Sequence, residues 1–393
     1  MKKLLLATAV SALAAGGAFA DEIKIGVLLG FTGPIDSITP MMANSAELAM
    51  RIVSESGAFL NGTTVVGVRA DDGCIDSALA QTAAERLITS DGVVAIMGAD
   101  CSGVTRAVLE NVAMANGIPM ISPSATSPGF STFDAGGLFY RTAPSDARQG
   151  QVLAEIVMGR GITSVAVTHT NNDYGLGLAT AFTEAYTAAG GTVTVTVPHE
   201  EAKGDYSAEV GALAAAGGDA LLVAGYLDGG GSMIRTAYEL GAFDQFFIGD
   251  GVHGDALIEK VGDAAGGIVG TLPSAAGEGA DRFAALAAAN GVDAASSFVG
   301  ESFDAAALLM LAAQAAGEAT PAGIAANVLN VANAPGEPIH ADELARGLEI
   351  LAAGGDIDYQ GATNVELIGF GEAAGSYREY NIQNGAFVTL AMH

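Results

Sequence analysis

The sequence is poor in aromatic residues, in cysteine and in basic residues. Its 393 residues include no tryptophan, two cysteines and 6% aromatic residues. Only 16 lysines and arginines stand against 44 acidic residues, which gives a formal net charge of −28 at pH 7. Such a chain repels nucleic acid and anionic lipid, so the composition argues against binding to either. We interpret the charge as a surface property that favours solubility, including in a salty medium that screens self-repulsion.

Motifs of common enzyme classes are also missing. The chain contains no Gly-x-Ser-x-Gly, His-Glu-x-x-His or Gly-x-x-x-x-Gly-Lys segment. His199-Glu200 lacks the second histidine, and Gly175-Leu176-Gly177 lacks the third glycine of a dinucleotide-binding loop. His169 and His253 follow predicted strands, but a loop histidine is more often a ligand contact or a surface residue than a general base. We therefore predict a non-catalytic protein without cofactor or metal, and keep an enzyme as the rival class.

Long apolar runs are absent, and the one near the start is short. The chain begins Met-Lys-Lys, continues with an apolar stretch over 4–13, and then has Ala18-Phe19-Ala20. This is the pattern of a secretory signal peptide. The stretch is shorter than the roughly 20 residues that a membrane-spanning helix needs. We expect cleavage after Ala20 and export to the periplasm.

Cys74 and Cys101 are the only cysteines. In an exported chain, such a pair favours a disulfide. A catalytic thiol and a metal site are the alternatives, although two cysteines without nearby histidines make a poor metal site. We predict a Cys74–Cys101 bridge, which would stabilise the fold by roughly 3–4 kcal/mol by restricting the unfolded chain.

Apolar strand-like segments alternate with segments of helical periodicity in two successive blocks. Predicted strands cover 23–29, 63–68, 93–97 and 118–121 in the first block, and 164–168, 193–197, 220–224 and 246–248 in the second. Predicted helices cover 41–54, 77–88, 104–115, 147–158, 178–189, 208–215 and 233–240. This alternation is typical of parallel sheets covered by helices on both faces.

The pattern changes beyond Thr271. Four alanine-rich segments have helical character, over 280–289, 298–316, 324–332 and 342–353. They are followed by predicted strands over 356–359 and 376–389, and Asn384-Gly385 within the latter predicts a hairpin turn.

Polar residues follow four of the predicted strands. In open parallel sheets, ligands bind beyond the carboxyl ends of the strands, where helix N-termini favour a carboxylate. The four loops are 98–103 and 122–126 in the first block, and 169–175 and 249–251 in the second. One half-site on each block predicts a ligand held between two lobes.

The side chains in these loops suit an α-amino acid. Ser102 and Thr126 offer hydroxyl and N–H groups for a carboxylate, and Asp250 offers an anion for an ammonium. Tyr174 and Tyr226 offer apolar faces with a polar tip. Each residue also has a plainer structural interpretation, since hydroxyl residues cap helices or turns and an aspartate between glycines suits a turn.

Short motifs are spread over nearly the whole mature chain. They are Ile23-Lys24-Ile25-Gly26-Val27, Gly33-Pro34, Asp71-Asp72-Gly73-Cys74, Cys101-Ser102, Pro123-Ser124-Ala125-Thr126, Asp173-Tyr174-Gly175, Gly225-Tyr226, Gly249-Asp250-Gly251 and Tyr359-Gln360-Gly361-Ala362. In this order the set resembles the periplasmic leucine/isoleucine/valine-binding proteins, the type I solute-binding receptors of ATP-driven (ABC) importers.

The resemblance implies a ligand site. Ser102 and Thr126 match residues that bind the ligand's α-carboxylate. Ser124 and Thr126 match positions that help hold its ammonium, Ser124 through its backbone carbonyl, and Ala125 lies between them in the same motif. Asp250 lies where the family has an acidic partner for the ammonium, although its loop is one residue shorter here.

The same resemblance places Tyr174 and Tyr226 among the aromatic residues of the second lobe that face the cleft. Ile38 departs from the family pattern, because an aromatic residue often closes the side-chain pocket at about that position. The resemblance therefore does not define the shape of the side-chain pocket.

The resemblance also implies the architecture, an α/β protein with two doubly wound parallel-sheet lobes joined by a three-strand hinge. We expect the chain to cross between lobes near Thr142, Pro273 and Tyr359. Lobe 1 would be 21–142 plus 274–358, and lobe 2 would be 143–273 plus 359–393. Ligand contacts with both lobes would favour a closed state.

The expected function is that of the periplasmic substrate-binding component of an ABC transporter. We expect a monomer that captures a branched-chain or other aliphatic amino acid and delivers it to a permease and ATPase complex at the inner membrane. The alternatives are the same fold binding a polar amino acid, an amide or an aromatic acid, or serving as a sensor module.

Overall fold

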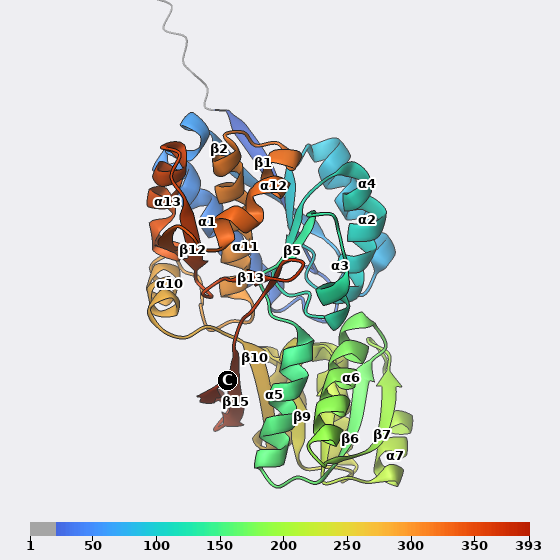
Figure 1. The fold of residues 1–393 in the computed structure, drawn as a ribbon. Coiled ribbons are helices and arrows are strands. Elements are labelled where there is room, and N and C mark those ends of the chain that lie inside the picture. The colour runs from blue at the N-terminus through green and yellow to red at the C-terminus, as the bar shows by residue number, and fades with distance from the viewer. Residues whose placement is uncertain (1–20) are drawn as a thin grey trace, which may run out of the picture.

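The structure, a computed structural model, describes residues 21–393. The predicted signal peptide falls on residues 1–20, outside the described residues. Figure 1 shows two lobes, one above the other, connected by chain segments that pass between them. Within the described residues, no helix combines the length and the hydrophobicity needed to cross a membrane.

The first lobe is built on a seven-stranded, mainly parallel sheet. Its strands are β1 (Glu22–Leu29), β2 (Thr64–Asp71), β3 (Ala95–Gly98), β4 (Met120–Ser122), β5 (Phe139–Arg141), β13 (Leu367–Ile368) and β14 (Glu372–Ala373). They lie in the order β13-β14-β5-β4-β3-β1-β2. A separate two-stranded sheet pairs β11 (Glu337–His340) with β12 (Ile357–Gly361).

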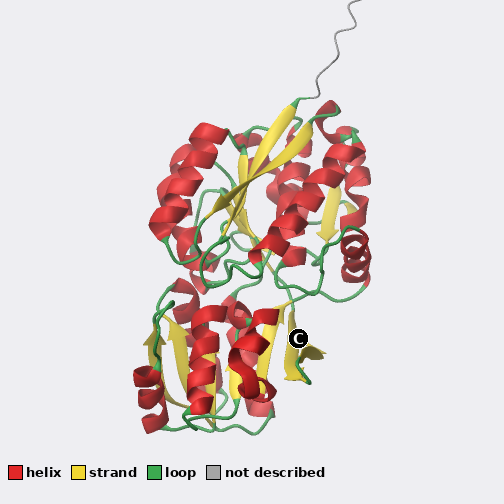
Figure 2. Cartoon of the chain, turned by 180° about the vertical axis from the view of Figure 1, so that it is seen from behind, coloured by secondary structure: helices red, strands yellow, loops and turns green. Residues whose placement is uncertain are grey.

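Helices flank the strands of this lobe (Figure 2). They are α1 (Thr39–Ser56), α2 (Ser77–Arg86), α3 (Ser102–Val108), α4 (Met114–Asn116), α10 (Glu278–Ala289), α11 (Val299–Ala316), α12 (Pro321–Ala332) and α13 (Leu344–Ala352). Nearly every side chain of α11 is buried, because this helix packs against α1, α12 and the strands β3 and β4. A helix that is apolar all round is typical of such a buried position.

The second lobe repeats the plan with another seven-stranded sheet, in the order β16-β15-β10-β9-β8-β6-β7. Its strands are β6 (Ser164–Thr170), β7 (Thr192–His199), β8 (Ala220–Ala224), β9 (Phe246–Ile248), β10 (Ile268–Pro273), β15 (Tyr377–Gln383) and β16 (Ala386–Met392). Its helices are α5 (Asp146–Gly159), α6 (Asp173–Ala188), α7 (Ser207–Ala216), α8 (Leu227–Glu239) and α9 (Asp255–Val261). The hairpin predicted at Asn384-Gly385 is confirmed, since this pair joins the antiparallel strands β15 and β16.

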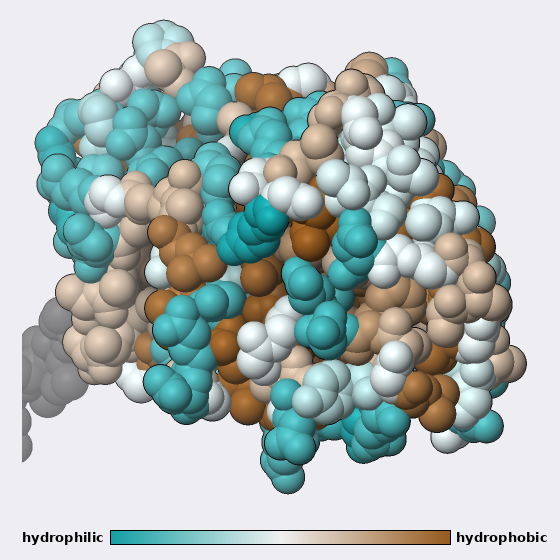
Figure 3. Space-filling model, turned by 90° about the horizontal axis from the view of Figure 1, so that it is seen from below, coloured by the Kyte–Doolittle hydropathy of each residue, from teal (hydrophilic) through white to brown (hydrophobic). Residues whose placement is uncertain are grey.

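Shorter helical turns connect these elements. They are η1 (Phe59–Asn61), η2 (Leu87–Asp91), η3 (Leu109–Ala113), η4 (Pro128–Thr132), η5 (Asp250–Val252), η6 (Gly262–Gly267) and η7 (Ala341–Glu343). Seen from below, onto the second lobe, hydrophobic residues form separate groups between hydrophilic ones (Figure 3). Its exposed large apolar side chains include Leu176, Leu240 and Leu390, and isolated apolar residues of this kind are usual on a protein surface.

The predicted α/β class with two doubly wound lobes is confirmed. The chain passes between lobes after β5, after β10 and between β14 and β15. The third crossing therefore differs from the prediction, which placed it at Tyr359 and assigned 359–373 to the second lobe. In Figure 1 the red chain runs from β13 in the upper lobe down to β15 in the lower one.

Two long-range contacts keep residues 359–373 in the first lobe. β14 pairs with β5 and so extends the first sheet. The hydroxyl of Tyr359 donates to Asp304 Oδ1 at 2.8 Å, and Asp304 belongs to the buried helix α11. Both contacts hold the chain in the first lobe until it has passed residue 373.

Candidate functional site

A pocket lies between the lobes, beyond the carboxyl ends of the parallel strands. Its lining residues are Ile35, Ile38, Met42, Asp100, Cys101, Ser102, Ser124, Tyr174, Tyr226, Asp250, Gly251 and Phe298. They include five of the predicted ligand-binding residues: Ser102, Ser124, Tyr174, Tyr226 and Asp250. We call it the cleft pocket. The loops predicted to form two half-sites are thus brought together, and their contact with a ligand stays a prediction.

The loops after β3 and β4 form the first-lobe wall and hold each other in place. The Ser124 hydroxyl donates to the backbone carbonyl of Asp100 at 3.1 Å. The backbone N–H of Ser127 donates to the hydroxyl oxygen of Ser102, the first residue of α3, also at 3.1 Å. The serine hydroxyls therefore stabilise the loops and line the pocket at the same time.

Arg141, at the end of β5, supports the loop that carries Ala125 and Thr126. Its guanidinium donates to the carbonyl oxygens of Ala125 at 2.8 Å and Ser127 at 2.9 Å, and pairs with Glu372. The N–H of Ala125 donates to a serine hydroxyl of the same loop, so both polar backbone groups of Ala125 are used inside the lobe. The Thr126 hydroxyl is buried without a hydrogen-bond partner among the described residues. Ala125 thus supports the wall, while Thr126 keeps an unused polar group.

The predicted disulfide between Cys74 and Cys101 is present, with the two Cα atoms 5.1 Å apart. It ties the loop after β2 to the residue that precedes α3. These cysteines and Asp100 form the one group of possible metal ligands within residues 21–393. Because the sulfurs are bonded to each other, they cannot act as thiolate ligands.

Asp100 and Asp72 are buried carboxyls beneath this wall. Asp100 accepts hydrogen bonds from the N–H groups of Gly30 at 2.7 Å and Cys101 at 2.6 Å, and so joins β1 to β3. Burial raises the pKa of both carboxyls, and the charge of Asp100 raises that of Asp72 further. Both effects favour the protonated form of Asp72.

Asp250 dominates the second-lobe wall. It opens η5 directly after β9 and is 1% exposed. Its Oδ1 accepts hydrogen bonds from the Tyr174 hydroxyl at 2.6 Å and from the Gly251 N–H at 3.0 Å. Burial raises the pKa of Asp250 to about 6, although both hydrogen bonds act in the opposite direction.

The two tyrosines predicted at the cleft lie side by side. The rings of Tyr174 and Tyr226 stack with their centroids 5.1 Å apart. A Cβ atom on Gly251 would lie 2.9 Å from the Tyr174 ring and 2.7 Å from the carbonyl of Gly225. The glycine at 251 is therefore required for this close packing.

Tyr226 faces the cleft pocket from the start of α8. Its buried hydroxyl has no hydrogen-bond partner within residues 21–393. Burial raises the pKa of Tyr226 well above its usual value, and the charge of Asp100 in the opposite lobe raises it further. Glu201 accepts hydrogen bonds from the N–H groups of Gly229 at 2.8 Å and Tyr226 at 3.3 Å, which fixes the first turn of this helix.

Asp146 adds a second acidic group close to Asp250. It is the first residue of α5, and its N–H donates to the carbonyl of Thr126 at 2.9 Å. Neither of its buried carboxyl oxygens has a partner among the described residues. Burial raises the pKa of Asp146 well above its usual value, and the charge of Asp250 raises it further. The charge of Arg141 acts in the opposite direction, and Asp146 is not among the residues that line the cleft pocket. Asp250 does line it and forms no ion pair within residues 21–393, so the pocket suits a ligand that carries a cation.

The remaining lining is apolar and comes from the first lobe. Ile35 and Ile38 precede α1, Met42 lies in its first turn, and Phe298 precedes α11. Ile38 does line the pocket, and its Cγ2 lies 3.2 Å from the position that a Cβ atom of Gly254 would occupy. An aliphatic side chain thus stands where the family resemblance led us to expect an aromatic one.

The lobes also touch outside the pocket. Arg106 on α3 pairs with Asp173 on α6 at 3.5 Å. A Cβ atom on Gly177 of α6 would lie 2.6 Å from Pro128 Cδ of the first lobe. The structure therefore shows the two lobes in a closed arrangement.

The two histidines that follow strands do not line the cleft pocket. Nδ1 of His169 lies 2.9 Å from the carbonyl of Thr170. His253 is buried, with its Nδ1 2.7 Å from the Ser297 hydroxyl, and burial lowers its pKa to about 3. Neither ring is placed to act as a general base on a molecule in this pocket.

Comparison with known proteins gives a consistent result. Residues 22–341 match the family described as periplasmic binding protein. The leucine-, isoleucine-, valine-, threonine- and alanine-binding protein of Pseudomonas aeruginosa is 30% identical over 328 residues, which cover 83% of this chain and 87% of that protein.

Solved structures agree in fold. A leucine-binding protein from Thermotoga maritima is 25% identical with a TM-score of 0.78, and the match covers 94% of this chain and 98% of that one. A solute-binding protein from R. palustris in complex with 4-hydroxybenzoate has a TM-score of 0.74, covering 95% and 97% of the two chains. Its identity is 18%, so this second likeness concerns the fold alone.

Proposed function

Because this chain belongs to the periplasmic binding protein family, whose members bind solutes and are not enzymes, we propose that it captures an aliphatic α-amino acid in the cleft pocket. The amino acid would be leucine, isoleucine, valine or a similar molecule. The protein would be exported with the help of residues 1–20 and act as a monomer. It would deliver its ligand to an ABC permease and ATPase complex at the inner membrane.

The observation that carries this proposal is the pairing of unlike walls across one pocket. Asp250 on one side forms no ion pair within residues 21–393, and it is already oriented by the Tyr174 hydroxyl. Ser102, at the start of α3, lines the other side, and the unpartnered hydroxyl of Thr126 belongs to the neighbouring loop after β4. A zwitterionic amino acid presents an ammonium to the first group and a carboxylate to the second.

Burial of charged groups determines the free energy of binding in this pocket. An ionised group costs several kcal/mol to transfer from water unless it is paired and hydrogen-bonded. An ammonium against Asp250 and a carboxylate at a helix start satisfy this condition for ligand and protein together. A neutral ligand would leave Asp250 without a cation.

The apolar lining favours an aliphatic side chain. Ile35, Ile38, Met42 and Phe298 offer no hydrogen-bonding side-chain group apart from the weakly accepting thioether sulfur of Met42. A polar amino-acid side chain would lose hydrogen bonds to water without replacement here. The relative from Pseudomonas aeruginosa, named for binding leucine, isoleucine, valine, threonine and alanine, supports the same ligand class.

Lobe closure would couple binding to transport. A ligand that contacts both walls stabilises the closed arrangement, and a transporter could recognise that arrangement. An aromatic acid, as held by the R. palustris protein, is the second ligand class to consider. It has no cationic group for Asp250, so the charge of this pocket supports it less well.

A thermal-shift screen would test the proposal. The purified protein, residues 21–393, would be mixed with amino acids, amides and aromatic acids, each at the same concentration. Leucine, isoleucine or valine should raise the melting temperature most, because a ligand at 100 times its dissociation constant stabilises the folded state by about 2.7 kcal/mol. A response to aromatic acids but to no amino acid would contradict the proposal.

A further inference from the structure

A second cavity, of about 370 Å³, lies beside the segments that connect the lobes. We call it the hinge pocket. It shares only Phe298 with the residues that line the cleft pocket. Glu301 comes from the first lobe, Leu272 and Arg378 from the second, and the crossing segment 274–277 forms part of the wall. A molecule in this pocket would therefore contact both lobes and the hinge.

Arg378 stands out among the arginines of the described chain. Apart from Arg235 and Arg378, each arginine within residues 21–393 forms an ion pair with an acidic side chain. Arg235 is exposed to water, whereas Arg378 is half-buried on β15 and its Nε has no hydrogen-bond partner in the described residues. Arg378 is therefore a half-buried cation without an ion-pair partner in a chain that has a large excess of acidic residues.

Glu301 is a buried acidic residue that lines the same pocket as Arg378. It lies in the first turn of α11 and is 5% exposed. Burial raises its pKa to about 8, although the charge of Arg378 acts in the opposite direction. Arg378 is thus close enough to act on Glu301 electrostatically, yet the two side chains form no ion pair with each other. The cavity lies between an acid and a base that both lack a partner.

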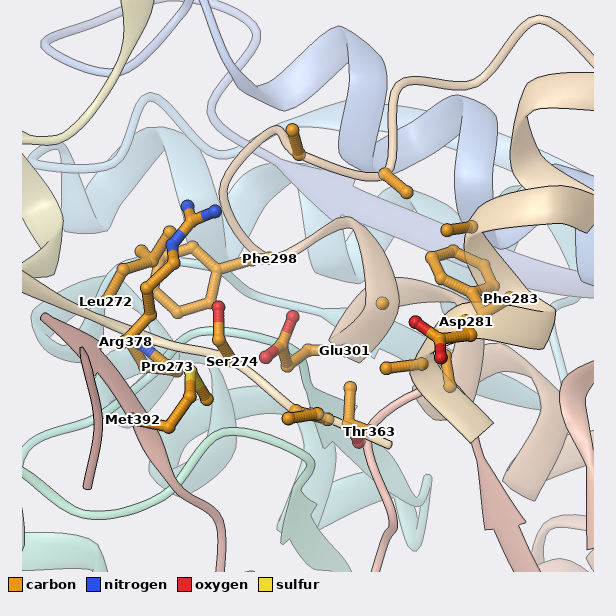
Figure 4. Close-up of a pocket in the computed structure, with 18 of the residues that line it drawn as sticks. Leu272, Pro273, Ser274, Asp281, Phe283, Phe298, Glu301, Thr363, Arg378 and Met392 are labelled. Atoms are coloured by element: carbon orange, nitrogen blue, oxygen red, sulfur yellow. The ribbon is translucent and has the colours of Figure 1, made fainter. Parts of the chain in front are cut away.

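The rest of the lining combines small, apolar and hydroxyl-bearing residues with one further acid, the exposed Asp281. Figure 4 shows Arg378, Leu272 and Met392 on one side of the hinge pocket, Asp281 and Phe283 on the other, and Ser274 and Glu301 between them. Several alanines complete the walls. A cavity lined by a base and a buried acid that form no ion pair with each other is complementary to a small dipolar molecule.

We propose that the hinge pocket is a second binding site, specific for a small zwitterion that carries one carboxylate and one ammonium group. The carboxylate lies against the guanidinium of Arg378, which is suited to bidentate recognition, and near the Ser274 hydroxyl. The ammonium lies against the carboxylate of Glu301. The ligand replaces the ion pair that the two side chains do not form, and each buried charge gains a partner.

Occupancy of the hinge pocket is linked to closure of the cleft. Because its walls come from both lobes, a bound zwitterion has different contacts in the open and closed states. Any difference in its affinity for the two states changes the affinity of the cleft pocket by up to the same factor, and ligand in the cleft changes the affinity of the hinge pocket reciprocally. The hinge pocket thus offers a way to modulate capture without competing for the cleft.

Equilibrium dialysis with radiolabelled glycine, the smallest amino-acid zwitterion, tests this inference. Wild-type protein, Arg378→Met and Glu301→Gln would be compared at pH 8. Both variants should bind glycine at the hinge pocket at least tenfold more weakly, while Asp250→Ala should retain that binding. The exposed pair Arg148 and Glu155 provides matched controls, Arg148→Met and Glu155→Gln, which should bind as wild type does.

The pH dependence adds a readout that loss of folding does not reproduce. Glu301 must lose a proton to receive the ammonium, so hinge-pocket affinity should fall about tenfold per pH unit below pH 8. In Glu301→Gln this dependence should vanish together with the binding. Melting temperatures of the two variants would show that both are folded. Glycine binding that is equal in wild type, Arg378→Met and Glu301→Gln would overturn the inference.

Discussion

The two walls of the cleft pocket are stabilised in different ways. The first-lobe wall is cross-linked by the disulfide between Cys74 and Cys101 and by the guanidinium of Arg141. The second-lobe wall depends on the stacked rings of Tyr174 and Tyr226, and it carries the carboxyl of Asp250, which forms no ion pair within residues 21–393. The first wall is thus held by a covalent bond and a charged cross-link, whereas the second presents a buried acid to the pocket.

This difference assigns separate roles to the walls. Changes in the cross-links of the first wall should act mainly on the free energy of unfolding. Changes in the second wall should act mainly on the free energy of ligand binding. The predictions below test whether these roles are separate. Leucine serves as the ligand throughout.

The largest effect is expected for Asp250→Ala. Removing the carboxylate leaves the ligand's buried ammonium without a partner, at a cost of about 4 kcal/mol, or about a thousandfold in affinity. Isothermal titration calorimetry would measure this loss, and Asp255→Ala, at the exposed start of α9, is the control. A variant that binds leucine within tenfold of wild type would show that Asp250 does not hold the ammonium.

Removal of the disulfide by Cys74→Ser with Cys101→Ser should act on stability instead. The chain-entropy model predicts a loss of about 3.5 kcal/mol for a loop of this length. Urea unfolding would measure it, with wild type under reducing conditions as a second route to the same state. Leucine affinity of the folded variant should stay within a few-fold of wild type. A large loss of affinity at unchanged stability would show that the first wall is not an independent platform.

The affinity should also depend on pH through Asp250. Burial raises its pKa to about 6, and the ammonium of the ligand requires the ionised form. Binding therefore releases a proton below pH 6, and the affinity falls by up to tenfold per pH unit as the pH decreases from 6 to 4. Calorimetry in two buffers with different ionisation enthalpies would detect this proton. A constant affinity between pH 7 and pH 5 would contradict the assignment.

The smallest effect is expected for Gly177→Ala. The added methyl would clash with Pro128 across the closed interface, so closure should cost about 1 kcal/mol more and affinity should fall about fivefold. Gly211→Ala, in α7, is a matched control, since a Cβ atom there meets no neighbour within 4 Å. Alanine is the better helix former, so both variants should keep or gain thermal stability. Equal leucine affinities would show that this interface does not close on the ligand.

Much of the fold could be predicted from the sequence because burial on both faces gives strands a simple pattern. The segments 220–224 and 246–248 are continuous apolar runs, and they coincide with β8 and β9. The strand β5 was missed, since it has three residues and one of them is the buried Arg141. A charge in so short a run hides its strand character.

The third crossing could not be predicted for a different reason. β13 and β14 have two residues each, which is too short for any periodicity. Their place in the first sheet is decided by pairing with β5, more than 200 residues earlier in the chain. Local sequence carries no information about a partner so distant.

In the candidate site, too, some residues could be predicted from local sequence and others could not. Ser102 and Asp250 could be found from their position after strands, where parallel sheets collect polar groups. Asp146 and Glu301 could not, because an acidic residue in the first turn of a helix is explained by the helix dipole alone. Their importance comes from elements of other parts of the chain that pack around them, which only the three-dimensional structure reveals.

A crystal structure of the protein with bound leucine is the most direct test of the account. The ligand's nitrogen should lie about 2.8 Å from a carboxylate oxygen of Asp250. The ligand's carboxylate should be hydrogen-bonded to the loops of Ser102 and Thr126. Leucine bound in the cleft pocket with its nitrogen turned away from Asp250, or bound outside that pocket, would contradict it.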